Sequence, residues 1–263
     1  MHIVTLTTDY GLRDYHLAAL KGALLVACGP LHVVDVSHNI SNYNIVQAAY
    51  LFRNAWPHFP EGSIHLLSVN DLDSPDKQFL ALKHEGHFFV GPDNGLFSLI
   101  FDPLPEQRFF VSNFAAEGYP LRRIFADAVH RIIQHPDPAE WGQPAAEIVR
   151  RLSFHPVTQA DQIRGTVIYV DNYENAVINI SEELFRQIGR ERGFQLFFKR
   201  HDPIVRLSRH YHDVPVGEPL CRFGDSGLLE IAVNQGKAST LLGLQVDDTV
   251  QIHFLDAPSK SRS

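Results

Sequence analysis

The feature that most constrains the fold is the alternation of strand-type and helix-type segments in the first half of the chain. Buried-type strands are separated by segments whose apolar residues recur at helical spacing, and a hairpin precedes a further helix. The expected strands are HIVTLTT (2–8), LHVVDVS (31–37) and SIHLLSV (63–69), the hairpin QFLALKH (78–84) with HFFVGPDNG (87–95), and the helices 15–28, 45–56 and 123–134. This alternation predicts an N-terminal α/β domain with a central, largely parallel sheet.

The second half of the chain has a different rhythm. From about Gly165 onward, the chain consists of short β-type runs separated by turns. These runs are GTVIYVD (165–171), AVINI (176–180), FQLFFK (194–199), PLCRFG (219–224), LLEIAVN (228–234) and TVQIHFL (249–255). We therefore predict a smaller C-terminal β-barrel-like domain. The expected layout is an α/β domain over 1–152, a linker over 153–164, the β-rich domain over 165–256 and a disordered tail over 257–263.

Composition excludes several classes of function. The 263 residues are 44% hydrophobic and 20% charged, with a formal net charge of −7, which argues against nucleic-acid binding. No apolar run approaches the ~20 residues needed to span a bilayer, so no membrane partner is expected. The first residues lack the features of a signal peptide, and the two cysteines are far apart. We expect a cytoplasmic protein with reduced thiols.

The acidic stretch from Asn70 to Lys77 raises the question of a metal site. Counted from Asp71 as an EF-hand loop, the sixth position holds Asp76, whereas that loop requires glycine there. The fifteen histidines form no HExxH pattern, and no glycine-rich phosphate motif is present. The sequence therefore does not support a calcium loop, a standard zinc motif or a conventional phosphate cradle.

Two polar residues have both a functional and a purely structural interpretation. Asp9 follows the first strand, where open α/β sheets bind ligands, and it can accept the hydroxyls of a ribose or serve only as a turn acid. Asn175 lies in a strand–turn–strand segment and can present its amide to a nucleobase or cap the turn.

Six motifs in a fixed order resemble one known family. They are TTDYGLRDYHLAALKG, VVDVSHNISNYNIVQAA, FPEGSIHLLSV, GPDNGLF, VDNYENAVINI and SGLLEIAVNQGKASTLLGL. Together they are similar to the S-adenosyl-L-methionine (SAM) hydrolases that form adenosine, also called SAM hydroxide adenosyltransferases, which are related to the fluorinase and chlorinase enzymes. The resemblance covers about His2 to Phe254.

The resemblance implies a homotrimer that acts on SAM without a metal or cofactor, with the substrate between the N-terminal domain of one subunit and the C-terminal domain of its neighbour. It also implies roles for individual residues. Asp9 would hold the ribose hydroxyls, and Tyr43 would pack near the ribose and sulfonium. The other substrate-binding candidates are Asn70, Asp171 for the methionine ammonium, Asn175 and the backbone at Val233 to Gln235 for adenine, Asp225 and Ser226 for the methionine carboxylate, and Glu230 on the next strand.

The water-handling residues depart from the family pattern. The family motif VVDPGVGTxRR supplies an Asp and an Arg, and a later FHGRD motif supplies a His. This chain has Asn70, Lys77 and Pro120 at those positions. Asn70 can hydrogen-bond a water but cannot accept its proton, and Lys77 lacks the bidentate fork of arginine. Asp71 or Asp73 can substitute if the loop is shifted, so the catalytic candidates are Asn70, Asp71 and Lys77.

Three functions follow from these observations. The first is hydrolysis of SAM to adenosine and L-methionine, by in-line attack of water on the ribose C5′, because the sulfonium makes methionine a good leaving group. The second is binding of SAM or adenosine without catalysis. The third is transfer of the adenosyl group to another nucleophile, which the negative charge of the 70–77 loop disfavours for an anion.

Overall fold

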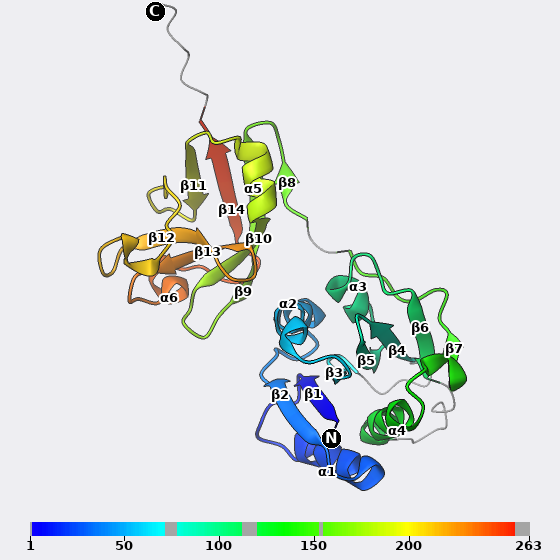
Figure 1. Ribbon diagram of the computed structural model, residues 1–263. Coiled ribbons are helices and arrows are strands. Elements are labelled where there is room, and N and C mark those ends of the chain that lie inside the picture. Colours follow the sequence, from blue (N-terminus) through cyan, green and yellow to red (C-terminus); the bar gives the residue numbers. More distant parts are fainter. Residues whose placement is uncertain (1, 72–77, 112–119, 153–154, 256–263) are drawn as a thin grey trace, which may run out of the picture. The chain divides into compact units, whose positions relative to one another are not determined.

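The chain forms two compact units, 1–153 and 154–263, each with its own sheet and hydrophobic core (Figure 1). The computed structural model describes residues 2–71, 78–111, 120–152 and 155–255. The predicted tail, Lys77 and Asp73 lie outside the described residues.

The N-terminal unit is built on a seven-stranded sheet. Its strands are β1 (Ile3–Thr8), β2 (His32–Ser37), β3 (Ile64–Ser68), β4 (Phe79–His84), β5 (His87–Pro92), β6 (Gln107–Val111) and β7 (Gly142–Pro144). The order is β2-β1-β3-β5-β4-β6-β7. The first four strands in this order pair in parallel, and the remaining pairs are antiparallel. The predicted α/β class and the hairpin at Glu85-Gly86 are confirmed.

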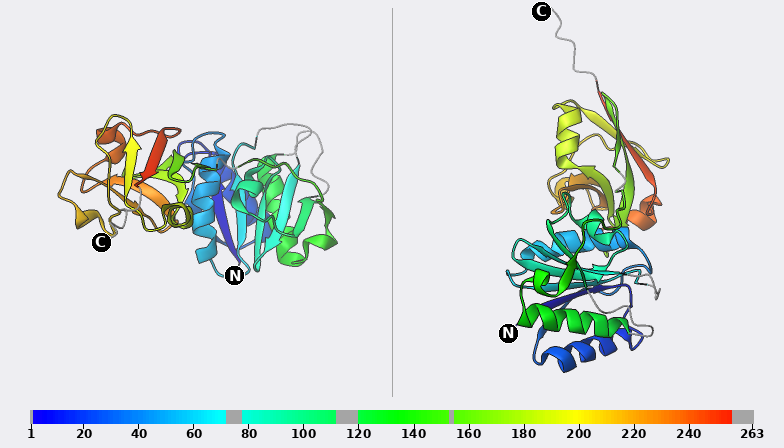
Figure 2. Two further views of the ribbon diagram at one scale, coloured as in Figure 1. Left: turned by 90° about the horizontal axis from the view of Figure 1, so that it is seen from above. Right: turned by 90° about the vertical axis from the view of Figure 1, so that its right-hand side faces the viewer.

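Helices cover both faces of this sheet. Its α-helices are α1 (His16–Cys28), α2 (Ile45–Ala55), α3 (Leu96–Ile100) and α4 (Leu121–Gln134), with 3-10 turns η1 (Trp56–His58) and η2 (Pro138–Glu140). One core cluster joins α1 and α4 to the sheet, and another joins α2 and α3 to it. Figure 2 shows α1 and α4 side by side on one face. The start of α2 is fixed by Asn44, whose side chain accepts the backbone N–H of Gln47 at 2.9 Å.

A buried histidine pair lies in the core beside α2. The side chain of His65 on β3 contacts Thr5 Oγ1 through Nδ1 at 2.8 Å and His87 Nδ1 through Nε2 at 3.1 Å. The rings of Phe52 and Trp56 pack edge-on against His65. Burial, with a smaller contribution from His87, lowers the pKa of His65 to about 3. His65 is therefore a neutral core residue at physiological pH.

The C-terminal unit is an antiparallel sheet that curls into a half-barrel (Figure 1). Its strands are β8 (Val157–Thr158), β9 (Gln162–Val170), β10 (Ala176–Ser181), β11 (Phe194–Phe198), β12 (Pro219–Phe223), β13 (Leu228–Val233) and β14 (Thr249–Phe254). The order is β11-β14-β9-β10-β13-β12, with β8 paired to β9. Helix α5 (Glu182–Gly189), the 3-10 turn η3 (Tyr211–Asp213) and helix α6 (Ala238–Leu242) complete it. The β-barrel-like class predicted for this half is confirmed.

The curl of this sheet depends on β9. The first part of β9 pairs with β14 and its second part pairs with β10. At Gly165, a Cβ would lie 2.7 Å from the Ile180 side chain and 2.8 Å from that of Ile178. The glycine therefore permits the close approach of β9 and β10.

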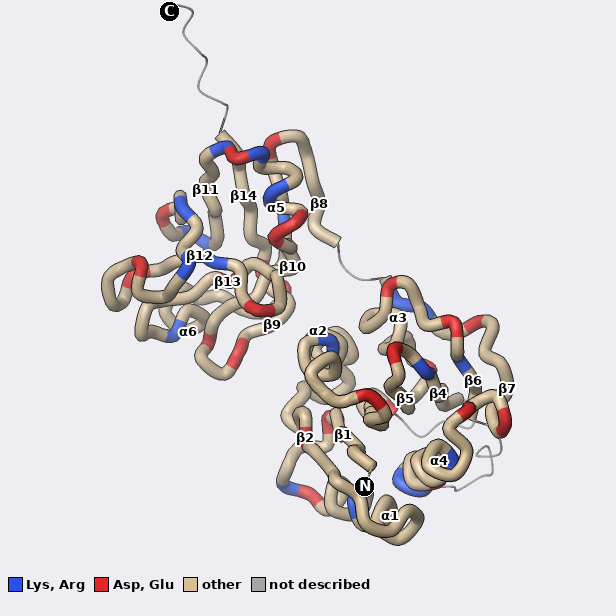
Figure 3. Tube along the Cα trace, viewed as in Figure 1, with Lys and Arg blue, Asp and Glu red and all other residues tan. Residues whose placement is uncertain are grey.

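Charged residues of both signs are interspersed along the described parts of both units (Figure 3). No helix among the described residues is both long and apolar enough to cross a membrane. No group of three or more His, Cys, Asp or Glu side chains in the described part of the chain is placed to hold a metal ion.

Candidate functional site

The strand order of the N-terminal sheet places a topological switch point between β1 and β3. Strand β1 lies between β2 and β3, and the helices that follow β1 and β2 cover opposite faces of the sheet. At such a change of direction, the carboxyl ends of neighbouring parallel strands leave room for a ligand. Asp9 directly follows β1, and Asn70 and Asp71 follow β3. The fold thus places these three predicted residues at the same edge.

Asp9 accepts two backbone N–H groups through one carboxylate oxygen. Its Oδ2 atom accepts the backbone N–H of Tyr43 at 2.9 Å and that of Asn70 at 3.2 Å. Only 8% of the residue is exposed. One carboxylate oxygen therefore joins the ends of β1 and β3 to the loop before α2, and three sequence-predicted residues come together.

Both donors to Asp9 have left-handed backbone conformations. The φ angle is 66° at Tyr43 and 53° at Asn70. Asparagine tolerates this conformation, whereas it is strained for an aromatic residue. Tyr43 is 60% exposed, so its ring is not held by burial in the core. The hydrogen bonds to Asp9 fix these two backbones.

The turn that carries Asp9 is fastened by His38, which lies just after β2. The N–H of Gly11 donates to the His38 carbonyl at 2.8 Å, and the Nδ1 atom of His38 lies 2.9 Å from Thr8 Oγ1. On the other side, the Asp9 carbonyl accepts the Asn42 side-chain amide at 3.2 Å. The position of the Asp9 carboxylate is thus set by residues of three separate segments.

Asp71 is bound by two hydroxyl groups that the sequence analysis did not select. The Tyr10 hydroxyl donates to Asp71 Oδ2 at 3.0 Å, and the Ser68 hydroxyl donates to the same oxygen. Tyr10 and Ser68 are themselves 2.6 Å apart at their oxygens. Burial and the charge of Asp71 raise the pKa of Tyr10. Asp71 therefore faces the same edge as Asp9.

The other positions that the family pattern assigns to water handling are Lys77, Pro120 and Asn70, and the described part of the chain does not bring all three together at this edge. Lys77 lies outside the described residues. Pro120 is the N-cap of α4 and is exposed. Asn70 also accepts the Asn94 side-chain amide at its carbonyl, at 3.2 Å.

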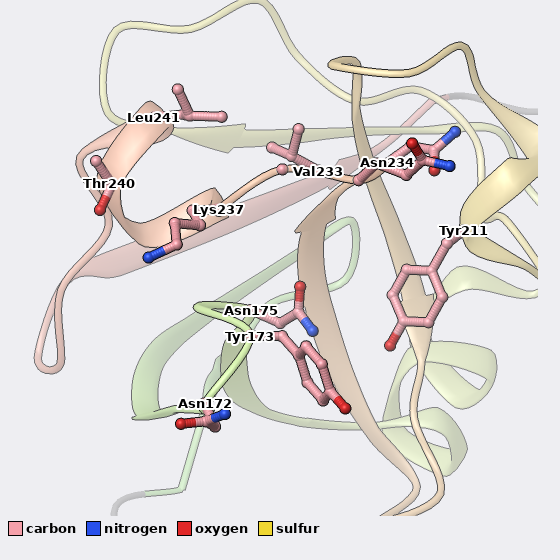
Figure 4. Close-up of a pocket in the computed structure, with 11 residues that line it drawn as sticks. Asn172, Tyr173, Asn175, Tyr211, Val233, Asn234, Lys237, Thr240 and Leu241 are labelled. Carbon is pink, nitrogen blue, oxygen red and sulfur yellow. The ribbon is translucent and has the colours of Figure 1, made fainter.

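The C-terminal unit contains a pocket of about 960 Å³ (Figure 4). This volume is in the range of small-molecule sites. It is lined by the β9–β10 turn, by the segment from β13 into α6, and by Tyr211 in η3, and Figure 4 shows these side chains around it. The lining residues are Asn172, Tyr173, Asn175, Tyr211, Val233, Asn234, Gln235, Gly236, Lys237, Thr240 and Leu241.

Asn175, one of the predicted adenine contacts, is held in this pocket by Asp171. The Asp171 Oδ1 atom accepts the backbone N–H of Tyr173 at 2.9 Å and that of Asn175 at 2.8 Å. Its Oδ2 atom accepts the Asn175 side-chain amide at 3.0 Å. These bonds fix the Asn175 amide group, and they occupy part of the acceptor capacity of Asp171.

Glu230 supports the pocket wall and does not line the pocket. Its Oε1 atom accepts the Tyr211 hydroxyl at 2.8 Å, and the Arg222 guanidinium lies 4.8 Å from the centre of the Tyr211 ring. Burial raises the pKa of Glu230, with a smaller contribution in the same direction from Asp171 and Asp225, while Tyr211 and Arg222 oppose it. Asp225 lies with Ser226 in the turn between β12 and β13, outside the pocket lining.

An ion pair joins two walls of the pocket. Glu174, in the β9–β10 turn, accepts Lys237 Nζ at 2.8 Å and the hydroxyl of Thr240 at 2.5 Å. We call these three residues the Glu174 clasp. The N–H of Ser239 also donates to the Glu174 carbonyl at 2.8 Å.

Several of these residues carry no distinctive signal in the amino-acid sequence. Tyr173 and Tyr211 lie in turns, so periodicity says nothing about them. Tyr211 belongs to RHYH (209–212), which attracts attention through its histidines. Tyr10 and Ser68 are 58 positions apart, and only the pairing of β1 with β3 brings them together.

Comparison with known proteins first defines the class of fold. A solved structure of an uncharacterized conserved protein from Thermotoga maritima superposes with a TM-score of 0.84, covering 95% of this chain and 99% of that one at 23% identity. The architecture of an α/β unit followed by a curled antiparallel β unit is therefore shared with a known structure.

The family then follows from the sequence comparisons. Residues 4–142 match the N-terminal domain of SAM hydroxide adenosyltransferase, and residues 165–251 match its C-terminal domain. The chain belongs to the SAM hydroxide adenosyltransferase family. It is 30% identical to an (R)-S-adenosyl-L-methionine hydrolase from Thermus thermophilus, over 93% of this chain and 97% of that protein. It is 24% identical to a protein of the same name from Methanocaldococcus jannaschii, over 97% of each chain.

Proposed function

We propose that this protein hydrolyses SAM to adenosine and L-methionine. The observation that carries the proposal is the pair of hydrogen bonds from Tyr43 and Asn70 to Asp9 Oδ2. These bonds gather the residues expected at the ribose and at the attacking water on one edge of the sheet. The relatives named SAM hydrolases, which match over nearly their whole length, support the same reaction.

The substrate-binding roles are divided between the two units of the fold. Asp9 accepts the ribose hydroxyls, and the Tyr43 ring lies near the ribose and sulfonium. The amide of Asn175 and the backbone from Val233 to Gln235 bind adenine. The remaining lone pairs of Asp171 accept the methionine ammonium, and Asp225 and Ser226 contact the amino-acid end of the substrate. Glu230 acts by holding Tyr211 at the pocket wall.

The chemistry requires positioning more than activation. A water oxygen forms a bond to C5′ as the C5′–S bond breaks, and the bonding electron pair stays on sulfur. The sulfonium becomes the neutral thioether of methionine, and one water proton is released. Holding the water in line with C5′ supplies most of the required rate enhancement. The proposed reaction needs no metal or organic cofactor.

The test is incubation of the purified protein with SAM in water enriched in ¹⁸O, followed by chromatography and mass spectrometry. We expect adenosine that carries one ¹⁸O atom, together with methionine in equal amount. SAM incubated without protein is the control for its spontaneous breakdown. Binding of SAM by calorimetry without either product would support the alternative of a non-catalytic binder and would overturn the proposal.

The family resemblance also leads us to propose a homotrimer whose substrate site lies at the subunit interface. Sedimentation velocity on the full chain, with and without adenosine, tests the assembly. A single species of about 30 kDa at all concentrations would contradict it, because the monomer mass is 29.7 kDa.

A further inference from the structure

Three oxygen atoms form a compact network beside Asp9. The Tyr10 hydroxyl lies 2.6 Å from Ser68 Oγ and donates to Asp71 Oδ2 at 3.0 Å, and the Ser68 hydroxyl donates to Asp71 Oδ2 as well. Tyr10 follows Asp9 at the end of β1, Ser68 ends β3, and Asp71 lies three residues further on. The pairing of β1 with β3 therefore assembles the network.

The number of protons determines what this network does. Three contacts link the oxygens, but a phenol and a serine hydroxyl supply only two protons. Burial and the charge of Asp71 raise the pKa of Tyr10, so the phenol keeps its proton at neutral pH. The Tyr10 proton and the Ser68 proton are then both directed to the Asp71 carboxylate. All the hydrogen bonds from described residues to Asp71 are made at Oδ2. Oδ1, as a carboxylate oxygen, can accept a hydrogen bond or a proton.

The network is continuous with the residues around the proposed ribose site. Asp71 is the neighbour of Asn70, whose N–H donates to Asp9 Oδ2 at 3.2 Å. Tyr10 is the neighbour of Asp9, and its N–H donates to Thr8 Oγ1 at 3.3 Å. Asn70 cannot accept a proton from water, because its side chain is an amide. Asp71, the next residue along the chain, has a carboxylate that can accept a proton from water.

We infer that Tyr10 and Ser68 are positioning residues that orient Asp71, and that Asp71 Oδ1 accepts the proton of the attacking water. This inference rests on the proposed hydrolysis of SAM. As the water oxygen bonds to C5′ and the C5′–S electron pair moves to sulfur, one water proton passes to Asp71 and then to solvent. The two hydroxyl groups keep Oδ2 occupied, so that the carboxylate presents only one oxygen to the water.

The experiment is a double-mutant cycle measured on SAM turnover. We compare Tyr10→Phe, which keeps the ring and removes the hydroxyl, with Asp71→Asn and with the double variant. Loss of a general base typically lowers kcat about 10²-fold or more, so we expect that effect for Asp71→Asn. Tyr10→Phe is expected to lower kcat about tenfold with KM for SAM within about twofold. The double variant should be no slower than Asp71→Asn alone, because Tyr10 acts through Asp71.

The serine gives an independent arm of the test. Ser68→Ala should reproduce the effect of Tyr10→Phe on kcat, and Ser68→Thr, which keeps a hydroxyl, should restore most of the activity. Tyr15→Phe is the matched control, since Tyr15 is 72% exposed and lies in the same segment of the chain. Urea unfolding of every variant identifies any that fails to fold, and the serine arm then decides in place of the tyrosine arm.

The outcomes separate this inference from the proposed function. If the unchanged protein turns over SAM but the decrease in kcat of the double variant equals the product of the two single decreases, the inference is overturned and the proposed function stands. An increase in KM without a decrease in kcat for Tyr10→Phe and Ser68→Ala would also overturn it. Absence of turnover in the unchanged protein would overturn both together.

Discussion

The carboxylate of Asp9 and the backbone N–H of Tyr43 are joined by a hydrogen bond of 2.9 Å. Through this bond, an acid at the end of β1 fixes the loop that leads into α2, and the same oxygen also binds the N–H of Asn70. Asp9 therefore has two functions in the proposal, because it holds two loop backbones in place and it accepts hydrogen bonds from the ribose hydroxyls. The two functions are separable by substitution.

Asp9→Ala should affect both stability and substrate affinity. Loss of hydrogen bonds to a charged group lowers the free energy of unfolding by about 1.5–3 kcal/mol. The KM for SAM should rise about tenfold or more. Asp9→Asn keeps an acceptor oxygen and should lose less stability. Urea titration and steady-state kinetics measure the two effects, with the exposed Glu106→Gln as control. Equal losses in Glu106→Gln would contradict the assignment.

The buried His65 predicts a specific dependence of stability on pH. Its pKa is about 3 in the folded protein and about 6.5 when unfolded, so the unfolded state binds the proton first as pH falls. Stability from this residue is complete above pH ~6.5 and is lost progressively down to pH ~3. From pH 7 to pH 5 we expect a loss of about 2 kcal/mol. His65→Gln should reduce this pH dependence in urea titrations, whereas the exposed His58→Gln should leave it unchanged.

Tyr211 should contribute to adenosine binding mainly through its ring. Stacking of a base on an aromatic side chain is worth about 1–3 kcal/mol, so Tyr211→Ala should weaken adenosine binding about tenfold or more. Tyr211→Phe keeps the ring and loses the hydroxyl that donates to Glu230, so it should weaken adenosine binding only a few-fold, by about 1 kcal/mol or less. Calorimetry measures both. Val246→Ala, at an exposed position of the same unit, is the control. If Tyr211→Ala and the unchanged protein bind adenosine with equal affinity, the Tyr211 ring does not contact the base.

The Glu174 clasp should make adenosine binding sensitive to salt. Its ion pair with Lys237 lowers the pKa of Glu174 and raises that of Lys237, and it ties the β9–β10 turn to α6. Exposed ion pairs are weak and are screened by salt, so Glu174→Gln should weaken binding about two- to fivefold at low salt and less at high salt. Glu182→Gln breaks a comparable ion pair with Arg186 outside the pocket and is the control. If adenosine binding by Glu174→Gln depends on salt as strongly as binding by the unchanged protein, the salt dependence arises from other charges.

The sequence predicts the scaffold of this fold well, for physical reasons. Buried strands such as β3 and long amphipathic helices such as α4 impose strong periodic patterns, so their existence and type can be inferred. The helices α3 and α6 have only five residues each, too few for a helical period to emerge. The short strand β7 was missed as well, because its pairing with β6 is decided by the tertiary fold.

The site is less predictable than the scaffold. Asp9 is visible in the sequence because a carboxylate after a first strand is informative by its position alone. Tyr10 and Ser68 are not, because an aromatic residue in a turn and a serine at the end of a buried strand both have ordinary structural explanations. Their significance depends on a distance of 2.6 Å between residues that are 58 positions apart. Glu230 shows the opposite case, since a conspicuous acid proves to support Tyr211.

The backbone of Tyr43 has a consequence for how this chain has been selected. With φ at 66°, an aromatic residue there carries a strain of roughly 1–2 kcal/mol that glycine would not have. Selection for folding alone would favour glycine at this position. If Tyr43 contacts the substrate as proposed, the loop before α2 is a place where greater stability and retained function pull the sequence in opposite directions.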